Sequence, residues 1–263
     1  MSKHNDVPNN LNPMTAKPPK PKKVRLDALL VERGYFADAQ AALRAVLAHE
    51  VKVGDVYATS AAVKVPSDAD IQVKGGMPYV SRGGFKLRGA LDAFDQDASG
   101  LRCIDIGSST GGFSDCLLQA GAAFVACVDV NYGQLAWRVR QDPRVVVFER
   151  TNIRTADPAD LGAPFDLAVA DLSFIGLASL APVFANLLDV GGVFIGLVKP
   201  QFESAHDETE RGVVLDEAVR LRTVDEVKQA LESASFDVTG VVESSITGTK
   251  GHNVEYLVRA VKL

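Results

Sequence analysis

After about residue 90, the chain alternates short apolar runs with segments of helical periodicity. Four of the runs read RCIDIG, AFVACVDV, FDLAVADL and GGVFIGLVKP. Runs that are apolar at nearly every position indicate strands buried on both faces, as in a mostly parallel sheet covered by helices. The final β stretches, FDVTGVVESSI and EYLVRAVKL, are separated by only a few residues, so we expect a hairpin with an antiparallel last strand. The sequence therefore predicts an α/β fold.

The region before this alternation has a different organisation. Two stretches with apolar side chains at helical spacing, LDALLVERG and FADAQAALRAVLAHE, precede short strands that begin with EVKVGDVYA. We predict a small α+β module over residues 24–78, a linker over 79–89 and the larger domain over 90–263. Residues 1–23 are dominated by Asn, Pro and Lys, which predicts a disordered basic arm or a tail without a role of its own.

Composition limits the classes of function. The formal net charge of −5 argues against a protein that coats nucleic acid through bulk positive charge, so any contact with nucleic acid must be local. The cysteines lack C-x-x-C spacing and predict reduced, buried thiols in a cytoplasmic protein without a metal site. They are Cys103, Cys116 and Cys127.

One stretch, residues 172–188, is uncharged and approaches the length of a membrane span. It is flanked by Asp171 and Asp189 instead of Lys or Arg, so we expect a buried amphipathic helix and no membrane contact. No charged and apolar leader opens the sequence, and we expect no export.

A glycine-rich turn follows the first strand of the larger domain, in CIDIGSSTGGFSD. The strand ends at Asp105 and Gly107, and the glycines let the backbone approach a ligand at the carboxyl end of the sheet. The spacing is G-x-x-x-G-G and not the dinucleotide pattern G-x-G-x-x-G. A second acid, Asp129, ends the next strand, where a carboxylate can hold ribose hydroxyls. The glycine turn and Asp129 together indicate a binding site for a nucleoside-type cofactor more than a tight strand-to-helix connection without a ligand.

Three charged residues end or interrupt other apolar strands. Asp171 in VADLSF can serve the same ligand-binding edge or cap a helix. Lys199 in GLVKPQFE is held in extended geometry by the following proline and can act as a base or extend to water. Glu255 in GHNVEYLV can face the site or lie outward on a half-exposed strand.

In combination, these stretches resemble the TlyA family, the hemolysin-like ribosomal RNA methyltransferases with an FtsJ-like catalytic domain. The resemblance rests on the ordered blocks RLDALLVERG, YVSRGGFKL, DIGSSTGGFSD, DVNYGQLAWRVRQDPRVVVFERTNIR, ADLSF, LVKPQFE and HNVEYL. It implies a Rossmann-like S-adenosylmethionine methyltransferase sheet that follows a small S-four-like RNA-binding domain. The implied reaction is S-adenosylmethionine-dependent methylation of the 2'-hydroxyl of cytidine in 16S or 23S ribosomal RNA, or in both.

The resemblance also assigns site residues. The family's Lys-Asp-Lys-Glu tetrad falls on Lys86, Asp171, Lys199 and Glu255. Cofactor contacts are expected from Asp105, Gly107, Ser109, Gly111, Asp129 and Asp171. Because a ribose hydroxyl is a weak nucleophile, Lys199 is the candidate base, or the group that orients the hydroxyl. Phosphate contacts are expected from the N-terminal arm and from Arg25, Arg44, Arg82 and Arg88.

Two other functions stay open at this point. The family's older name suggests a membrane-active hemolysin, which would need an exported chain with an amphipathic or spanning segment. The acids outnumber the bases between residues 27 and 74, which suggests a ribosome-binding assembly factor that keeps the cofactor but methylates poorly. The expected partners are ribosomal RNA or ribosomal subunits, and the sequence does not define an oligomeric state.

Overall fold

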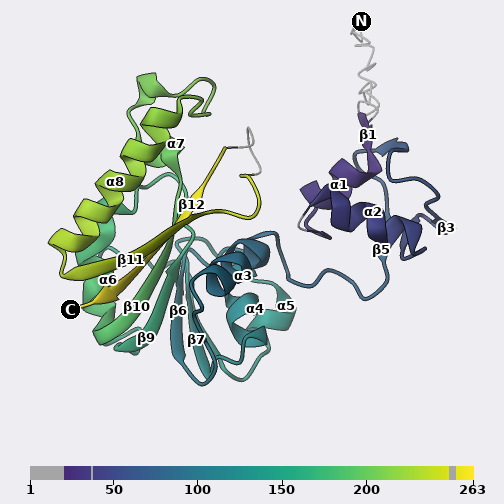
Figure 1. Cartoon of the computed structure of the whole chain (residues 1–263). Coiled ribbons are helices and arrows are strands. Elements are labelled where there is room, and N and C mark those ends of the chain that lie inside the picture. The colour runs from purple at the N-terminus through teal and green to yellow at the C-terminus, as the bar shows by residue number, and fades with distance from the viewer. Residues whose placement is uncertain (1–20, 37, 249–252) are drawn as a thin grey trace, which may run out of the picture.

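The computed structural model describes residues 21–36, 38–248 and 253–263. Most of the predicted basic arm, residues 1–20, therefore lies outside the described residues. The chain forms a small domain and a larger α/β domain, with the segment after β5 running between them (Figure 1).

The small domain packs a pair of helices on short strands. Leu26, Leu29 and Leu30 of α1 are buried against Ala42 and Val46 of α2, as the helical spacing predicts. A two-residue turn at Gly54 and Asp55 joins β2 to β3. The elements are β1 (Lys23–Arg25), α1 (Leu26–Glu32), α2 (Ala39–Leu47), β2 (Val51–Val53), β3 (Val56–Tyr57), β4 (Lys64–Pro66) and β5 (Ile71–Val73).

The larger domain is built on a sheet with the strand order β11-β12-β10-β9-β6-β7-β8. The strands from β6 to β10 are parallel, and β12 runs antiparallel to both β10 and β11. The predicted α/β class, mostly parallel with an antiparallel last strand, is confirmed. The strands are β6 (Arg102–Ile106), β7 (Phe124–Val128), β8 (Val145–Phe148), β9 (Phe165–Ala170), β10 (Leu188–Val198), β11 (Phe236–Glu243) and β12 (Tyr256–Lys262).

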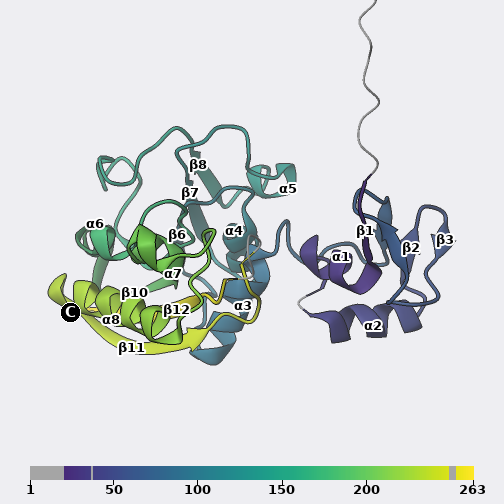
Figure 2. The ribbon, with the colours of Figure 1, turned by 90° about the horizontal axis from the view of Figure 1, so that it is seen from above.

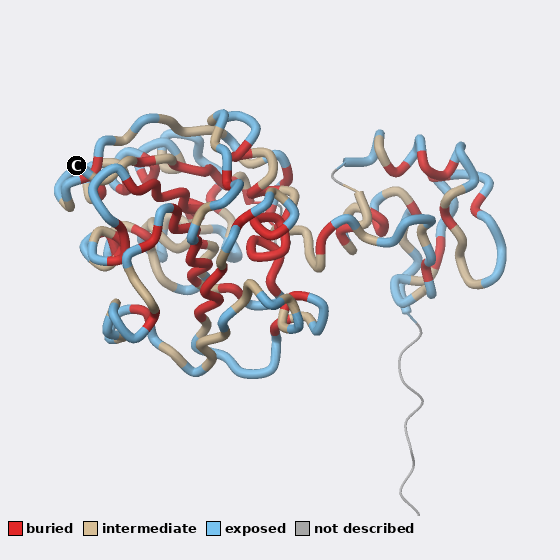
Figure 3. The backbone as a smooth tube through the Cα atoms, turned by 90° about the horizontal axis from the view of Figure 1, so that it is seen from below, coloured by how far each residue is buried: buried red, intermediate tan, exposed pale blue. Residues whose placement is uncertain are grey.

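Helices cover both faces of this sheet (Figure 2). On one face, α3 (Gly83–Ala93), α4 (Gly112–Gln119) and α5 (Trp137–Arg140) pack on the cluster that contains Cys103. On the other face, α6 (Ala181–Leu187) and α8 (Glu217–Ser233) pack on the cluster that contains Ile104. Successive residues of β6 thus face opposite layers, and the buried residues run through the strands and the helices that cover them (Figure 3).

The predicted linker is wrong for residues 83–89, because they form the first turns of α3. Leu87 and Leu91 of this helix are buried in the core of the larger domain. Gly84 of this helix serves close packing. A Cβ on Gly84 would lie 2.2 Å from Cγ of Tyr79, and one on Gly112 would lie 3.1 Å from the Gly84 nitrogen. Only glycine lets the ends of α3 and α4 approach this closely.

The uncharged stretch 172–188 is divided among several short elements. It contains the 3-10 helix η1 (Ala178–Leu180) and α6, and Phe184 and Leu187 of α6 are buried against the sheet. Within the described ranges, none of the helices combines the length and apolar character that crossing a membrane requires.

Candidate active site

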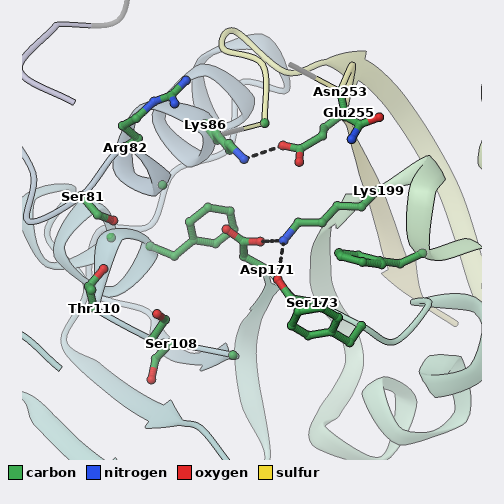
Figure 4. Close-up of a pocket in the computed structure, with 18 of the residues that line it drawn as sticks. Ser81, Arg82, Lys86, Ser108, Thr110, Asp171, Ser173, Lys199, Asn253 and Glu255 are labelled. Atoms are coloured by element: carbon green, nitrogen blue, oxygen red, sulfur yellow. Dashed lines mark hydrogen bonds and ion pairs between the residues drawn. The ribbon is translucent and has the colours of Figure 1, made fainter. Parts of the chain in front are cut away.

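A cavity of about 870 Å³ lies at the carboxyl ends of β6, β9 and β10. In the sheet, β6 lies between β7, the next strand of the chain, and β9. The chain therefore reverses its strand order at β6, and this is the edge at which open α/β sheets bind their ligands. The cavity wall combines charged and polar side chains with apolar ones and is drawn from α3, the glycine turn, the strand ends and the segment before β12 (Figure 4).

The glycine turn brings backbone close to the floor of the cavity. Gly107 has φ +80°, and a Cβ there would lie 2.8 Å from the carbonyl oxygen of Asp171. Glycine is required at this position both for the conformation and for the space. The turn ends at α4, whose first residue is Gly112.

Asp105 lies beside this turn and is fully buried. Its Oδ2 accepts hydrogen bonds from the backbone N–H of Ser114 at 2.9 Å and from the Ser114 hydroxyl at 2.5 Å. Its Oδ1 is buried and has no hydrogen-bond partner among the residues that the structure describes. Burial raises the pKa of Asp105 to about 7, against the opposing effect of the Ser114 hydrogen bonds. A residue that lines the cavity thus carries an unused acceptor, which fits a ligand with an N–H or O–H donor.

The other predicted cofactor residues divide into two groups. Ser109 lines the cavity with Asp105 and Gly107. Gly111 and Asp129 are not among the lining residues. A Cβ on Gly111 would lie 2.8 Å from Cδ1 of Leu135, so this glycine serves packing. The carboxylate of Asp129 accepts the backbone N–H of Ser109 at 2.8 Å and so braces the turn. A cofactor contact of Gly111 or Asp129 stays a prediction.

The structure brings the four predicted catalytic residues together as a pair of ion pairs on the cavity wall. Lys199 Nζ lies 2.5 Å from Asp171 Oδ1 and donates to the Ser173 hydroxyl at 3.2 Å. Lys86 of α3 forms an ion pair with Glu255, and the side chains of these residues are 10% and 3% exposed. Figure 4 shows the ammonium of Lys86 directed at Glu255, and Lys199 reaching Asp171 and Ser173.

The predicted set leaves out much of the cavity wall, including Ser173, Asn253 and Phe174. Ser173 supports Lys199, and Asn253 lies two residues before Glu255 with only 3% of its surface exposed. Phe174 is 87% exposed although its ring lies 5.3 Å from that of Phe202. The block ADLSF contains Ser173 and Phe174 directly after Asp171, but no pattern in the sequence shows which of these side chains faces the cavity.

The predicted RNA-binding arginines are dispersed. Arg82 lines the cavity and donates to the carbonyl oxygen of Thr247 at 2.9 Å. Arg25 pairs with Asp27 at 2.6 Å, and Arg88 pairs with Asp92 at 2.5 Å. Arg44 is exposed on α2. Of the four, Arg82 alone lines the cavity, and an RNA contact of any of them stays a prediction.

The fold and the cavity define the class of protein. Residues 79–262 match the family of FtsJ-like methyltransferases. The chain belongs to this family and, within it, to the TlyA group, as the following similarity shows. It is 42% identical over 238 residues, 89% of this chain and 88% of the relative, to a Mycobacterium tuberculosis protein named 16S/23S rRNA (cytidine-2'-O)-methyltransferase TlyA.

Two further comparisons cover nearly the same length. The chain is 34% identical to hemolysin A of Brachyspira hyodysenteriae, over 89% of this chain and 98% of that protein. A solved structure of a hemolysin-like protein from Streptococcus thermophilus aligns with a TM-score of 0.71 and 36% identity, over 91% of this chain and 88% of that one. The predicted family, fold and S-adenosylmethionine-dependent methyltransferase class are confirmed. The S-four-like character of the small domain stays a prediction.

Proposed function

We propose that the protein transfers the methyl group of S-adenosylmethionine to the 2'-hydroxyl of a cytidine in 16S or 23S ribosomal RNA, or in both. The observation that carries the proposal is the pair of lysine–carboxylate ion pairs on the wall of the cavity beside the glycine turn. The M. tuberculosis relative is named for this activity on cytidine. The proposal includes action in the cytoplasm, where ribosomal RNA is found.

The residues of the glycine turn fit the cofactor. S-adenosylmethionine, when bound, supplies a methyl group on a positively charged sulfur. The unused oxygen of Asp105 is an acceptor for a donor of the cofactor, and Gly107 leaves room for it against the backbone. Ser109 completes this side of the cavity. We assign Asp105, Gly107 and Ser109 to cofactor binding.

Lys199 is the residue that we assign to the ribose hydroxyl. A hydroxyl must lose its proton as the new bond forms, so an amine or carboxylate has to receive the proton nearby. Asp171 and Ser173 fix Lys199 Nζ at the end of β10. Lys199 can receive this proton only as a neutral amine, after the ammonium of the ion pair has released a proton to water. Asp171 can then still accept one of its N–H groups, which turns the nitrogen lone pair toward the cavity. Asp171 therefore positions the base.

The second pair, Lys86 and Glu255, is drawn above Lys199 and Asp171 in Figure 4. Buried charges are stable only when they are paired, so this pair keeps the cavity polar without a net charge of its own. We assign to Lys86 an electrostatic and positioning role toward the ribose, and to Glu255 the role of holding Lys86.

Phe174 supports an RNA substrate with an accessible base. A large apolar side chain that is 87% exposed at a cavity mouth is available for stacking, and every base offers a flat face to an aromatic ring. The small domain, by its resemblance to S-four-like domains, is proposed to bind neighbouring RNA.

The proposed function is tested by incubating the purified protein with labelled S-adenosylmethionine and with small-subunit, large-subunit or transfer RNA, free and as subunits. Label in ribosomal RNA that maps to a 2'-O-methylated cytidine by reverse-transcription stops is the expected result. Label in transfer RNA alone would contradict the substrate. Binding of S-adenosylmethionine without transfer of label to any RNA would favour the hypothesis of a ribosome-binding assembly factor. Leakage of liposomes without S-adenosylmethionine would favour the hemolysin reading.

A further inference from the structure

A tight turn at the edge of the cavity carries an arginine in an unusual conformation. Glu210 and Val213 exchange both backbone hydrogen bonds, at 2.8 and 3.0 Å, which leaves a two-residue loop between them. Its central residues, Arg211 and Gly212, have φ +52° and +80°. A loop with positive φ at both positions favours Asn, Asp or Gly at the first one. A side chain kept there against the backbone preference indicates a function for that side chain.

The turn is fixed to the active site by one buried side chain. Nδ2 of Asn253 donates to the carbonyl oxygen of Gly212 at 2.9 Å, and its Oδ1 accepts the backbone N–H of Val214 at 3.2 Å. Asn253 lies two residues before Glu255, and Figure 4 shows the two side chains together. The position of Arg211 is therefore set by the same short segment that carries a member of the tetrad.

Around the turn, the arginine lines the cavity and the acidic residues do not. The acids Asp207, Glu208 and Glu210 precede Arg211, but none of them lines the cavity, whereas Arg211 and Gly212 do. Glu208 is engaged by Arg222 at 2.6 Å. In the part of the chain that the structure describes, no carboxylate lies within ion-pair distance of Arg211. The lysines of the tetrad, in contrast, both have a carboxylate partner.

We infer that Arg211 binds a backbone phosphate of the RNA next to the nucleotide that enters the cavity. An exposed guanidinium without an acidic partner is suited to a phosphodiester, which it can bind through two parallel hydrogen bonds. Through Asn253, this contact fixes the RNA relative to Glu255 and so the ribose relative to the rest of the wall. The inference rests on the proposed function and extends it to a substrate contact within a locally acidic loop.

The test uses the full-length protein with Arg211→Asn. Asn suits the turn, so the melting temperature should equal or exceed that of the wild type, and binding of S-adenosylmethionine by calorimetry should be unchanged. In filter-binding assays the affinity for RNA should fall about fivefold. The slope of log affinity against log salt concentration should decrease by about one, as expected for the loss of one phosphate contact. Arg211→Lys should retain part of the affinity. Lys228→Gln removes a half-buried cation of α8 that pairs with Asp225 and lies outside the cavity wall; it is the control and should change none of these values.

The outcomes separate this inference from the proposed function. Wild-type affinity and salt dependence in Arg211→Asn would overturn the phosphate contact. A lower melting temperature or weaker cofactor binding would overturn it as well, because the arginine would then serve the fold. If Arg211→Asn weakens RNA binding while the wild type leaves ribosomal RNA unlabelled, the contact stands and the proposed reaction fails.

Discussion

Lys199 and Asp171 meet with 2.5 Å between Nζ and Oδ1, although each follows a different strand. Asp171 follows β9, and Lys199 follows β10. These strands are parallel neighbours in the sheet, so their carboxyl ends lie side by side. The ion pair is therefore placed by strand order, and Ser173 refines it with a hydrogen bond of 3.2 Å.

Replacing Lys199 by Ala should abolish methyl transfer and leave S-adenosylmethionine binding intact. The side chain is assigned to the ribose hydroxyl, and its polar contacts are with Asp171 and Ser173, so the loss should fall on the chemical step, by at least about a hundredfold. Calorimetry measures the affinity for S-adenosylmethionine, and single-turnover labelling measures the rate of methyl transfer. Lys228→Ala, far along α8, serves as the control. Wild-type turnover in Lys199→Ala would refute the assignment.

Breaking the Lys86–Glu255 pair should destabilise the fold. Lys86→Met leaves the carboxylate of Glu255 buried and unpaired, and a loss of one partner of a buried pair costs about 3–5 kcal/mol. The double variant Lys86→Met with Glu255→Leu removes both charges and should regain most of the free energy of unfolding. Urea unfolding of the wild type, Lys86→Met, Glu255→Leu and the double variant gives the free energies of unfolding for this double-mutant cycle.

The double variant also separates stability from catalysis. It should remain inactive on RNA although it is folded, because Lys86 is assigned to the ribose. If the double variant is as unstable as the single variants, the destabilisation does not come from leaving one buried charge unpaired. If it methylates RNA, the assignment of Lys86 is incorrect.

Asp105 should make stability depend on pH. Burial raises its pKa from 3.8 to about 7, so between these values the folded carboxyl is protonated while the unfolded one is ionised. The folded state then binds more protons, and the free energy of unfolding falls as the pH rises through this window, by at most about 1.4 kcal/mol per pH unit. Asp105→Asn removes this titration, so the variant should gain stability relative to the wild type from about pH 4 to pH 7.

The measurement is urea unfolding of both proteins at several pH values across that window. Asp237→Asn, at an exposed position of β11, is the matched control. A stability difference between Asp105→Asn and the wild type that does not change with pH would contradict the prediction. The same variant should bind S-adenosylmethionine more weakly, since the unused Oδ1 is assigned to the cofactor.

Phe174→Ala should lower kcat/KM for RNA about tenfold, because stacking of a base on an aromatic ring contributes about 1–3 kcal/mol. The melting temperature and cofactor binding should not change, since the side chain is 87% exposed. Val190→Ala is a control with a side chain that is 78% exposed at the start of β10, the end of the strand away from Lys199. Equal RNA kinetics for Phe174→Ala and the wild type would exclude a base contact.

The sheet and the places of Asp171 and Lys199 could be predicted from local patterns, whereas Lys86 and the grouping of the four charged residues followed from the family resemblance. Apolar runs mark buried strands, and Asp171 and Lys199 lie directly after two of them. The linker prediction fails over residues 83–89 because these residues belong to α3. Their actual role depends on Tyr79 and Gly112, which no local pattern connects to them.

The supporting residues of the site could not be predicted for the same reason. Asn253 acts through Gly212 and Val214, about forty positions earlier in the chain, and its partners are visible only in three dimensions. The exposure of Phe174 depends on a left-handed backbone at φ +67°, which the sequence ADLSF does not indicate. Side-chain direction near a strand end is set by tertiary contacts more than by sequence.

The pairing of Lys86 with Glu255 has a consequence for the folding of the chain. The two residues are 169 positions apart, and Glu255 directly precedes β12, the strand that inserts between β10 and β11. Lys86 therefore gains this counter-ion only when β12 has taken its place in the sheet. A chain in which β12 has not yet joined the sheet thus lacks a complete set of the four charged residues.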